Sequence, residues 1–257
     1  VDVFVNPKIV AEQYYENNVV NLPAYLNVLP DKISPVLSVK IDGRQIINGD
    51  FVSSNPLILI SVKDENKFLI KTDTIGMKIF LDRPCSQNDC PTERIFLKRN
   101  DIKWFPGTLT SDFKIEFRPT ALPEGEYKLI IEATDASGNK SGLEPYEIAF
   151  QVKNETTLTF QSVFPNPSSS HFNFNFVVTG NNVPDEFTLV INSIDGATQQ
   201  RFDLDDITDF HIGTNTLFWE PRDSGGNSLP AGLYLFRMKF NVNGQTYSNS
   251  GKLVLVR

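Results

Sequence analysis

Histidine and cysteine are scarce in this sequence, which has two of each among 257 residues. His171 and His211 lie far along the chain from Cys85 and Cys90, so the closely spaced ligands of a tetrahedral zinc site are missing. The cysteine spacing also differs from the redox Cys-x-x-Cys pattern, and neither thiol has a histidine nearby in sequence to act as a base. We therefore expect no metal site and no catalytic residue of these types.

Long apolar runs and basic stripes are also lacking. No stretch reaches the roughly 18 apolar residues of a membrane span, so no transmembrane segment is predicted. The first residues lack the basic, apolar and small-residue order of a signal peptide, and we expect the sequence to be the interior or end of a longer chain. A net charge of -7 without clustered Lys and Arg argues against nucleic acid as a partner.

Recognisable catalytic motifs are missing too. The sequence contains neither a nucleophile elbow nor a Gly-rich phosphate loop. A catalytic site would have to be assembled from scattered Asp and Glu, whose separation in space is a property of the fold. We expect no enzyme activity in this chain and no cofactor.

The two cysteines allow two interpretations. Cys85 and Cys90 bracket a polar, turn-rich segment, in which they either form a disulfide that closes a hairpin loop or remain free thiols. We favour the disulfide, which would indicate an oxidising or extracellular compartment.

Short β-strand patterns fill most of the sequence. There are 20 Phe, and 15 Gly with 16 Pro interrupt the chain at short intervals, as in all-β proteins. Apolar residues alternate over 36–41, and Asp42-Gly43-Arg44 then predicts a turn. Ile46-Ile47, followed by Asn48-Gly49-Asp50, repeats the pattern, so this region is expected to form strand, turn and strand.

Two β-sandwiches account for the length of the chain. About seven strands are predicted within 31–155, which is typical of an Ig-like or fibronectin-like sandwich. Phe172, Phe174 and Phe176 alternate with polar residues, and three aromatic rings on one strand face require a partner sheet. We predict an all-β fold of two Ig-like antiparallel β-sandwich domains in tandem, over 31–155 and 156–257.

Asp135 and Asn139 are the candidates for a structural calcium site. Their oxygens suit Ca²⁺ at a loop end, but Asp and Asn in turns often cap their own backbone instead. The capping interpretation is favoured, and calcium stays the alternative.

The C-terminal part carries a family resemblance. Pro165-Asn166-Pro167, the turn glycine Gly196, the strand with Gly232 and Tyr234, and the last strand from Lys252 to Arg257 follow one another in order. In these features, residues 160–257 resemble the C-terminal sorting domain of proteins exported by the type IX secretion system of Bacteroidetes. Gly225-Gly226 to Tyr234 also resembles the Ig-like fold of flagellar hook-capping proteins.

Two further resemblances concern the preceding residues. The segment 11–22 resembles the closing strand of an adhesion-type Ig-like repeat, so 1–30 is expected to be a remnant of that repeat or a linker. The segments 42–50 and 63–68 resemble the region before the sorting domain in large surface proteins with a gingipain-like peptidase domain, related to type IX sortases. This resemblance implies that any peptidase residues lie upstream of residue 1.

The resemblance to the sorting domain implies a function and a set of partners. The second domain would direct export of an upstream cargo across the outer membrane to the cell surface, with the first domain as a spacer. An outer-membrane translocon and shuttle would bind its exposed face and terminal strand, with Lys252 and Arg257 available to acidic partners, although such residues also protect strand edges. A sortase would cleave near 153–168 and attach the cargo to surface lipopolysaccharide.

An adhesive or carbohydrate-binding module is the alternative function. β-Sandwiches use exposed aromatic side chains as sugar platforms, and Trp104 lies next to a predicted turn. Trp219 ends an alternating strand and is expected to pack in the core instead.

Overall fold

The computed structural model describes residues 2–5, 9–21, 30–85, 92–223, 225–242 and 244–256. The chain divides into two units, Val1–Ile33 and Ser34–Arg257. In the first unit, β1 (Asp2–Phe4) pairs antiparallel with β2 (Val19–Asn21), which follows the short 3-10 helix η1 (Glu16–Asn18). All residues of β1 and β2 are exposed, so this hairpin encloses no core.

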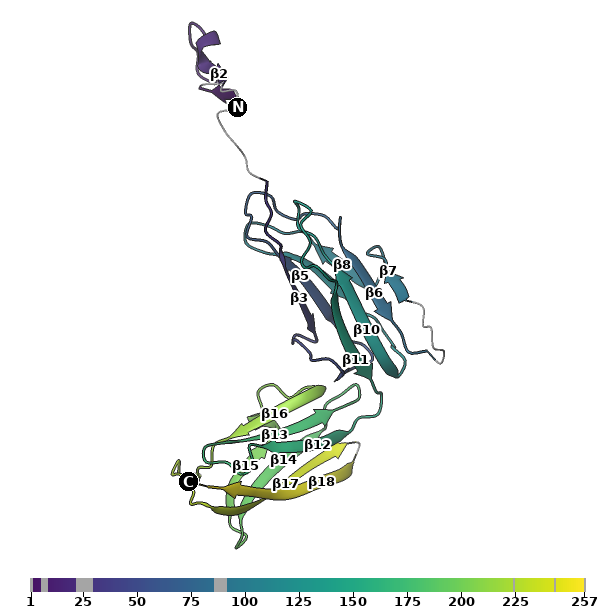
Figure 1. The fold of residues 1–257 in the computed structure, drawn as a ribbon, viewed down its shortest axis with the longest axis vertical. Helices are drawn as coiled ribbons and strands as arrows, with labels where there is room; N and C mark the ends of the chain where they lie inside the picture. The colour runs from purple at the N-terminus through teal and green to yellow at the C-terminus, as the bar shows by residue number, and fades with distance from the viewer. Residues whose placement is uncertain are drawn as a thin grey trace. The chain divides into compact units, whose positions relative to one another are not determined.

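Two sheets form the first sandwich of the second unit (Figure 1). One has the strand order β3-β5-β9-β8 and the other β4-β11-β10-β6-β7. The strands are β3 (Val36–Ile41), β4 (Asp50–Val52), β5 (Ile58–Lys63), β6 (Lys78–Asp82), β7 (Thr92–Ile95), β8 (Ile102–Phe105), β9 (Phe113–Phe117), β10 (Gly125–Glu132) and β11 (Tyr146–Val152). Alternate residues of these strands point inward and form one continuous apolar core between the sheets.

The region after β3 departs from the sequence prediction. The turn at Asp42-Gly43 is present, with φ of 50° and 85° and mutual backbone hydrogen bonds between Ile41 and Arg44. No strand forms at 46–47, however, because the chain crosses to the other sheet, where β4 pairs parallel with β11. The other pairs of described strands are antiparallel, as predicted. The partner of β4 is the edge of β11, a hundred residues later, which local periodicity does not reveal.

The second sandwich has its own apolar core. Its sheets have the orders β12-β13-β16 and β15-β14-β17-β18. Its elements are β12 (Leu158–Phe164), β13 (Phe172–Val178), β14 (Glu186–Ser193), β15 (Thr198–Asp203), the 3-10 helix η2 (Leu204–Asp206), β16 (Gly213–Trp219), β17 (Gly232–Val242) and β18 (Gln245–Leu255). Phe172, Phe174 and Phe176 are fully buried, which confirms that their shared face packs on a partner sheet.

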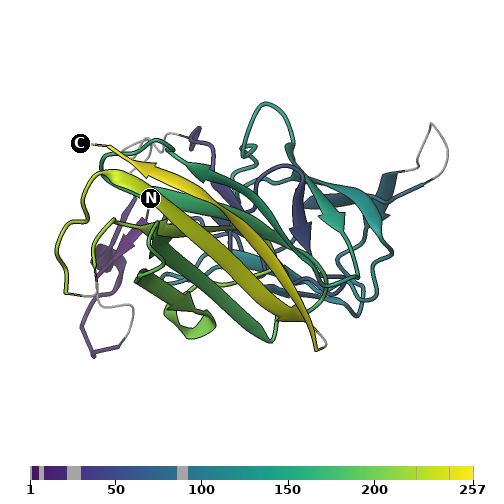
Figure 2. The same ribbon diagram turned by 90° about the horizontal axis from the view of Figure 1, so that it is seen from below.

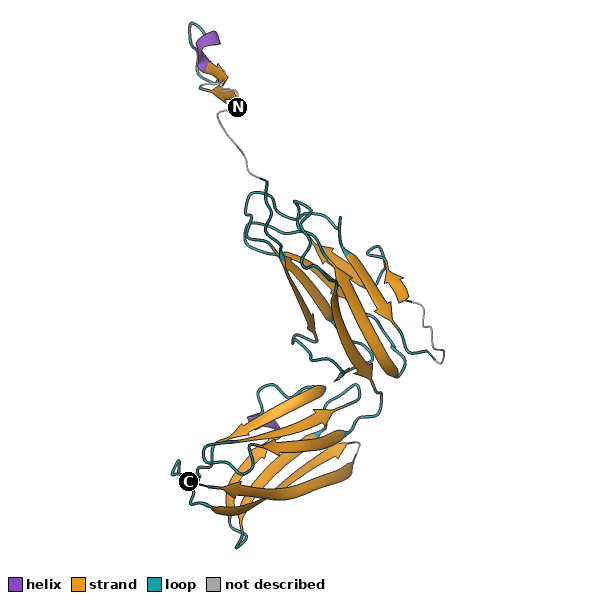
Figure 3. Cartoon of the chain, in the orientation of Figure 1, coloured by secondary structure: helices purple, strands orange, loops and turns teal. Residues whose placement is uncertain are grey.

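Strands thus dominate the described residues (Figure 3), and the fold is all-β with Ig-like sandwiches in tandem. Neither of the two short helices among the described residues is long enough to span a membrane. The hairpin of β17 and β18 is the longest pair of strands, with eleven residues in each (Figure 2). Among the described residues, those that carry the family resemblance lie around one end of this hairpin.

Candidate functional site

The last residues of β18 are hydrogen-bonded to the segment Pro165-Asn166-Pro167. The Asn166 side-chain amide donates to the Lys252 carbonyl at 2.8 Å, and its carbonyl oxygen accepts from the Val254 N–H at 2.9 Å. The amide group therefore pairs with β18 as a neighbouring strand would. Both X-Pro peptide bonds of the segment, before Pro165 and before Pro167, are cis.

Ser168 extends this pairing by one step. Its N–H donates to the Val254 carbonyl at 2.9 Å, and its carbonyl accepts from the Val256 N–H at 2.8 Å. The buried Ser168 hydroxyl is turned inward and donates to the His171 carbonyl. Asn166 and Ser168 together cover the outer edge of β18 from Lys252 to Val256.

The remaining motif residues lie at the same end of the sheet. Gly232 pairs with Leu255, and Tyr234 pairs with Leu253 on one side and with Ser193 of β14 on the other. Gly196 lies in the turn that follows β14, with φ of 89°. Arg257 lies outside the described residues. The structure therefore brings Asn166, Gly196, Gly232, Tyr234 and Lys252 to one end of the β14-β17-β18 sheet.

A tyrosine fixes the start of β17. The Tyr234 hydroxyl donates to the Pro230 carbonyl at 2.7 Å, and the Tyr127 hydroxyl donates to the Pro123 carbonyl at 2.8 Å in the first sandwich. Both belong to the pattern Leu-Pro-x-Gly-x-Tyr, which occurs once in each sandwich. A tyrosine that bonds the backbone a few residues upstream is a recurrent device of Ig-like sandwiches. Burial raises the pKa of both phenols.

A polar junction that sequence reasoning missed links the two sandwiches. Asp50 is 3% exposed, and its carboxylate accepts from Arg44 at 2.9 Å, from the Thr214 N–H at 2.8 Å and from the Thr214 hydroxyl at 3.0 Å. Arg44 also donates to the Ile212 carbonyl. Asn181 accepts from the Ser54 N–H at 2.8 Å. No local signal indicates these contacts, because Asp50 and Thr214 are 164 positions apart.

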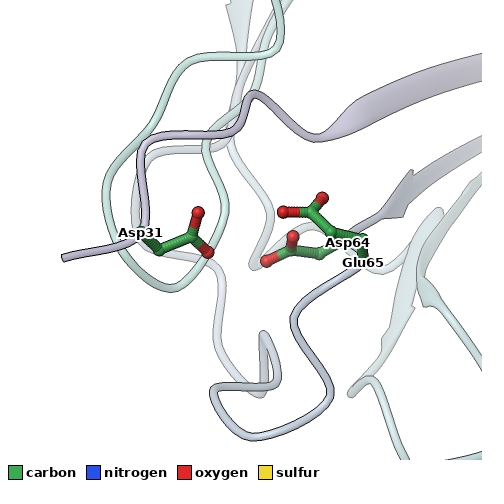
Figure 4. Close-up of side chains that lie close together, drawn as sticks. All are labelled: Asp31, Asp64 and Glu65. Carbon is green, nitrogen blue, oxygen red and sulfur yellow. The ribbon is translucent and has the colours of Figure 1, made fainter. Parts of the chain in front are cut away.

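The calcium candidates make the contacts of a capped turn. Asp135 accepts from the Asn139 N–H with one oxygen and from the Asn139 side-chain amide with the other, both at 2.8 Å. Asp223 and Asn227 repeat this arrangement in the second sandwich, where hydrogen bonds from the Asn227 backbone and side chain lower the pKa of Asp223. Figure 4 shows Asp64 and Glu65 beyond the end of β5; an acidic pair by itself does not define a metal site.

The cysteines and tryptophans differ in their surroundings. Cys85 is disulfide-bonded, and the chain's other cysteine, Cys90, lies outside the described residues. Trp219 is 4% exposed and packs in the second core, as its position in the alternating strand predicts. Trp104 is 41% exposed on the edge strand β8, where its ring stacks on Phe113.

The comparisons with known proteins give structural likenesses only. No protein-family model matches the chain, and no curated protein matches it. A crystal structure of dimeric latent PorU from Porphyromonas gingivalis shares 18% identity at a TM-score of 0.36, covering 92% of this chain and 21% of that one. Fibronectin(III)-like modules of Clostridium thermocellum CbhA share 11% identity at a TM-score of 0.29, covering 86% of this chain and 94% of theirs. The chicken CNTN1 FN1-FN3 domains share 10% identity at a TM-score of 0.26, covering 83% of this chain and 70% of theirs. The chain thus spans about a fifth of the PorU chain, and its own fold is defined by the strand pairings above.

Proposed function

We propose that the second sandwich directs export of an upstream cargo through a type IX secretion system, with attachment at the cell surface, and that the first sandwich is a non-catalytic spacer. The observation that carries this proposal is the grouping of the motif residues. Asn166 is 86 positions from Lys252 in sequence, yet it bonds to β18 at the end where Gly232 and Tyr234 of β17 also lie. A translocon or shuttle that recognises folded domains would contact the exposed Asn166, Gly232 and Lys252 there, while Tyr234 is buried beneath them.

The strand boundaries narrow the place at which a sortase would cleave. The expected region was 153–168, but residues 158–164 form β12, and Asn166 and Ser168 are hydrogen-bonded to β18. Residues 153–157 between β11 and β12 lie outside the strands, and Asn154 and Glu155 are exposed there, although the Asn154 N–H bonds to Glu124 and the Glu155 carbonyl bonds to Thr179. Cleavage there would release an intact second sandwich and leave the cargo with the first.

The test fuses residues 1–257 to the C-terminus of a fluorescent reporter in a bacterium with a type IX system. We expect reporter on the cell surface or in the medium, and loss of export when the last six residues are deleted. Because Leu253 and Leu255 are buried, this deletion also disturbs folding, so Asn166→Ala provides a milder second variant. Asn173→Ala, on β13, is the matched control. Retention of the wild-type fusion in the periplasm would refute the proposal.

One observation favours an additional sugar-binding role for the first sandwich. Trp104 is 41% exposed on the edge strand β8, as an aromatic platform requires, whereas its neighbour Phe105 points to the opposite face of the sheet. Glycan-array binding by the wild-type chain that is lost in Trp104→Ala would support this role. Equal binding by both proteins, or no binding by either, would exclude it.

A further inference from the structure

The outer edge of β18 is covered along only part of its length. The backbone groups that face this edge belong to Lys252, Val254 and Val256, which bond to Asn166 and Ser168. Backbone groups that face one side of a strand recur at every second residue. Thr246, Ser248 and Ser250 therefore direct their N–H and C=O groups to the same edge, where no described residue bonds to them.

This open stretch lacks the features that usually protect an edge strand. Natural edges carry charged side chains, prolines or bulges, which prevent another strand from pairing. Residues 245–251 contain no charge and no proline, and β18 pairs with β17 in an unbroken register. Two of the other three edge strands of the same sandwich differ, because the pairings of β12 and β15 contain irregularities and β15 carries Arg201 and Asp203. The third, β16, has an unbroken register and no charge, but the Thr214 N–H bonds to Asp50.

The charges beside the open edge indicate the chemistry of a partner. Arg237 pairs with Ser250 and Lys239 pairs with Ser248, so both cations lie on the same sheet face as these small hydroxyls. Neither cation forms an ion pair within the described part of the chain. A strand added to β18 would lie two strand spacings, about 10 Å, from β17, which is within reach of long Arg and Lys side chains across the serines.

We propose that the edge of β18 from Thr246 to Ser250 accepts an extended strand of a partner protein, whose side chains over Arg237 and Lys239 are acidic. This inference deepens the proposed function and rests on it for the identity of the partner as a component that recognises the second sandwich. It moves the docking position from Lys252 and Arg257 to the middle of β18. The reason is that Asn166 and Ser168 already occupy the edge at Lys252.

The binding test uses the full chain and a short end-capped peptide that alternates valine and glutamate. At a peptide concentration of about ten times the Kd, amide hydrogen exchange should slow roughly tenfold at Thr246, Ser248 and Ser250. A peptide that alternates valine and lysine cannot form ion pairs with Arg237 and Lys239. It should therefore bind roughly fivefold to tenfold more weakly than the valine and glutamate peptide. Absence of slowing at all three amides would overturn the proposal.

Two variants separate the backbone contribution from the charge contribution. Ser248→Pro removes an N–H that faces the open edge and none that pairs with β17, so it should abolish peptide binding. The double variant Arg237→Glu with Lys239→Glu should reverse the preference between the two peptides, and this result decides the question if the proline variant does not fold. Arg222→Glu, an exposed charge change elsewhere, is the control that should bind like wild type. Equal binding by a folded Ser248→Pro protein would contradict strand addition.

The reporter assay distinguishes failure of this inference from failure of the proposed function. If the wild-type fusion is exported and the Ser248→Pro fusion is not, the open edge is the surface that the export machinery uses. If both are exported equally, the inference fails and the sorting function stands. If the wild-type fusion is not exported, the sorting function fails, and the peptide measurements still decide whether β18 accepts a strand.

Discussion

Asn166→Ala is expected to loosen the end of β18 without unfolding the second sandwich. The substitution removes the donor to the Lys252 carbonyl and the acceptor for the Val254 N–H. A hydrogen bond of this kind contributes about 0.5–1.5 kcal/mol net, and the exposed position of Asn166 favours the lower part of that range. The two bonds together should therefore stabilise the pairing by about 1–2 kcal/mol.

Amide hydrogen exchange at Val254 measures this effect directly. A loss of about 1–2 kcal/mol corresponds to exchange that is roughly 5–30 times faster. Asn166→Asp keeps an acceptor for Val254 and loses the donor to Lys252, so its exchange should fall between wild type and Asn166→Ala. Unchanged exchange at Val254 in Asn166→Ala, with Asn173→Ala as the control, would refute the argument that the Asn166 side chain substitutes for a strand.

Three other sets of substitutions have defined outcomes. Asp50→Ala leaves Arg44 without its buried carboxylate partner, so denaturant unfolding should show that the free energy of unfolding falls by about 3–5 kcal/mol. A decrease below about 1 kcal/mol would contradict a stabilising role for this junction. Tyr127→Phe and Tyr234→Phe should each cost about 0.5–1.5 kcal/mol. Burial raises the pKa of both phenols, so their contribution to stability is complete below the ordinary tyrosine pKa and is lost as pH rises through the folded-state pKa. The stability of the double variant should therefore decline less steeply at alkaline pH than that of wild type. Gly251→Ala places a Cβ 2.5 Å from the buried Phe236 ring, so it should reduce the free energy of unfolding by about 1–3 kcal/mol and lower the melting temperature. Gly232→Ala has open space around it and should change the free energy of unfolding by no more than about 0.5 kcal/mol. Equal effects of the two substitutions would contradict this reasoning.

Local pattern was a good guide to strands and a poor guide to their partners. The alternation of Phe172, Phe174 and Phe176 predicted a buried strand face, because side-chain period is a property of the strand itself. The turn at Asp42-Gly43 followed from residues that tolerate positive φ. The strand expected at 46–47 was wrong, since the following segment pairs instead with an edge that the distant β11 provides.

The candidate site divides in the same way. Its residues were selected by their order in the sequence, but the reason for Asn166 emerged only from its two hydrogen bonds to a strand 86 and 88 positions later. The covering of β18 by Asn166 and Ser168 also changed the expected docking position. The sequence could not show which backbone groups of β18 remain without a partner. That depends on every segment that lies beside the strand in the folded protein.

By itself, the amino-acid sequence determined the all-β class, the alternating faces and the tight turns of this protein, because each depends on residues within a few positions of one another. Tertiary structure alone decided the parallel pairing of β4 with β11, the junction at Asp50 and the open edge of β18. The physical reason is that backbone hydrogen bonds between strands and buried ion pairs join groups whose separation along the chain leaves no local pattern.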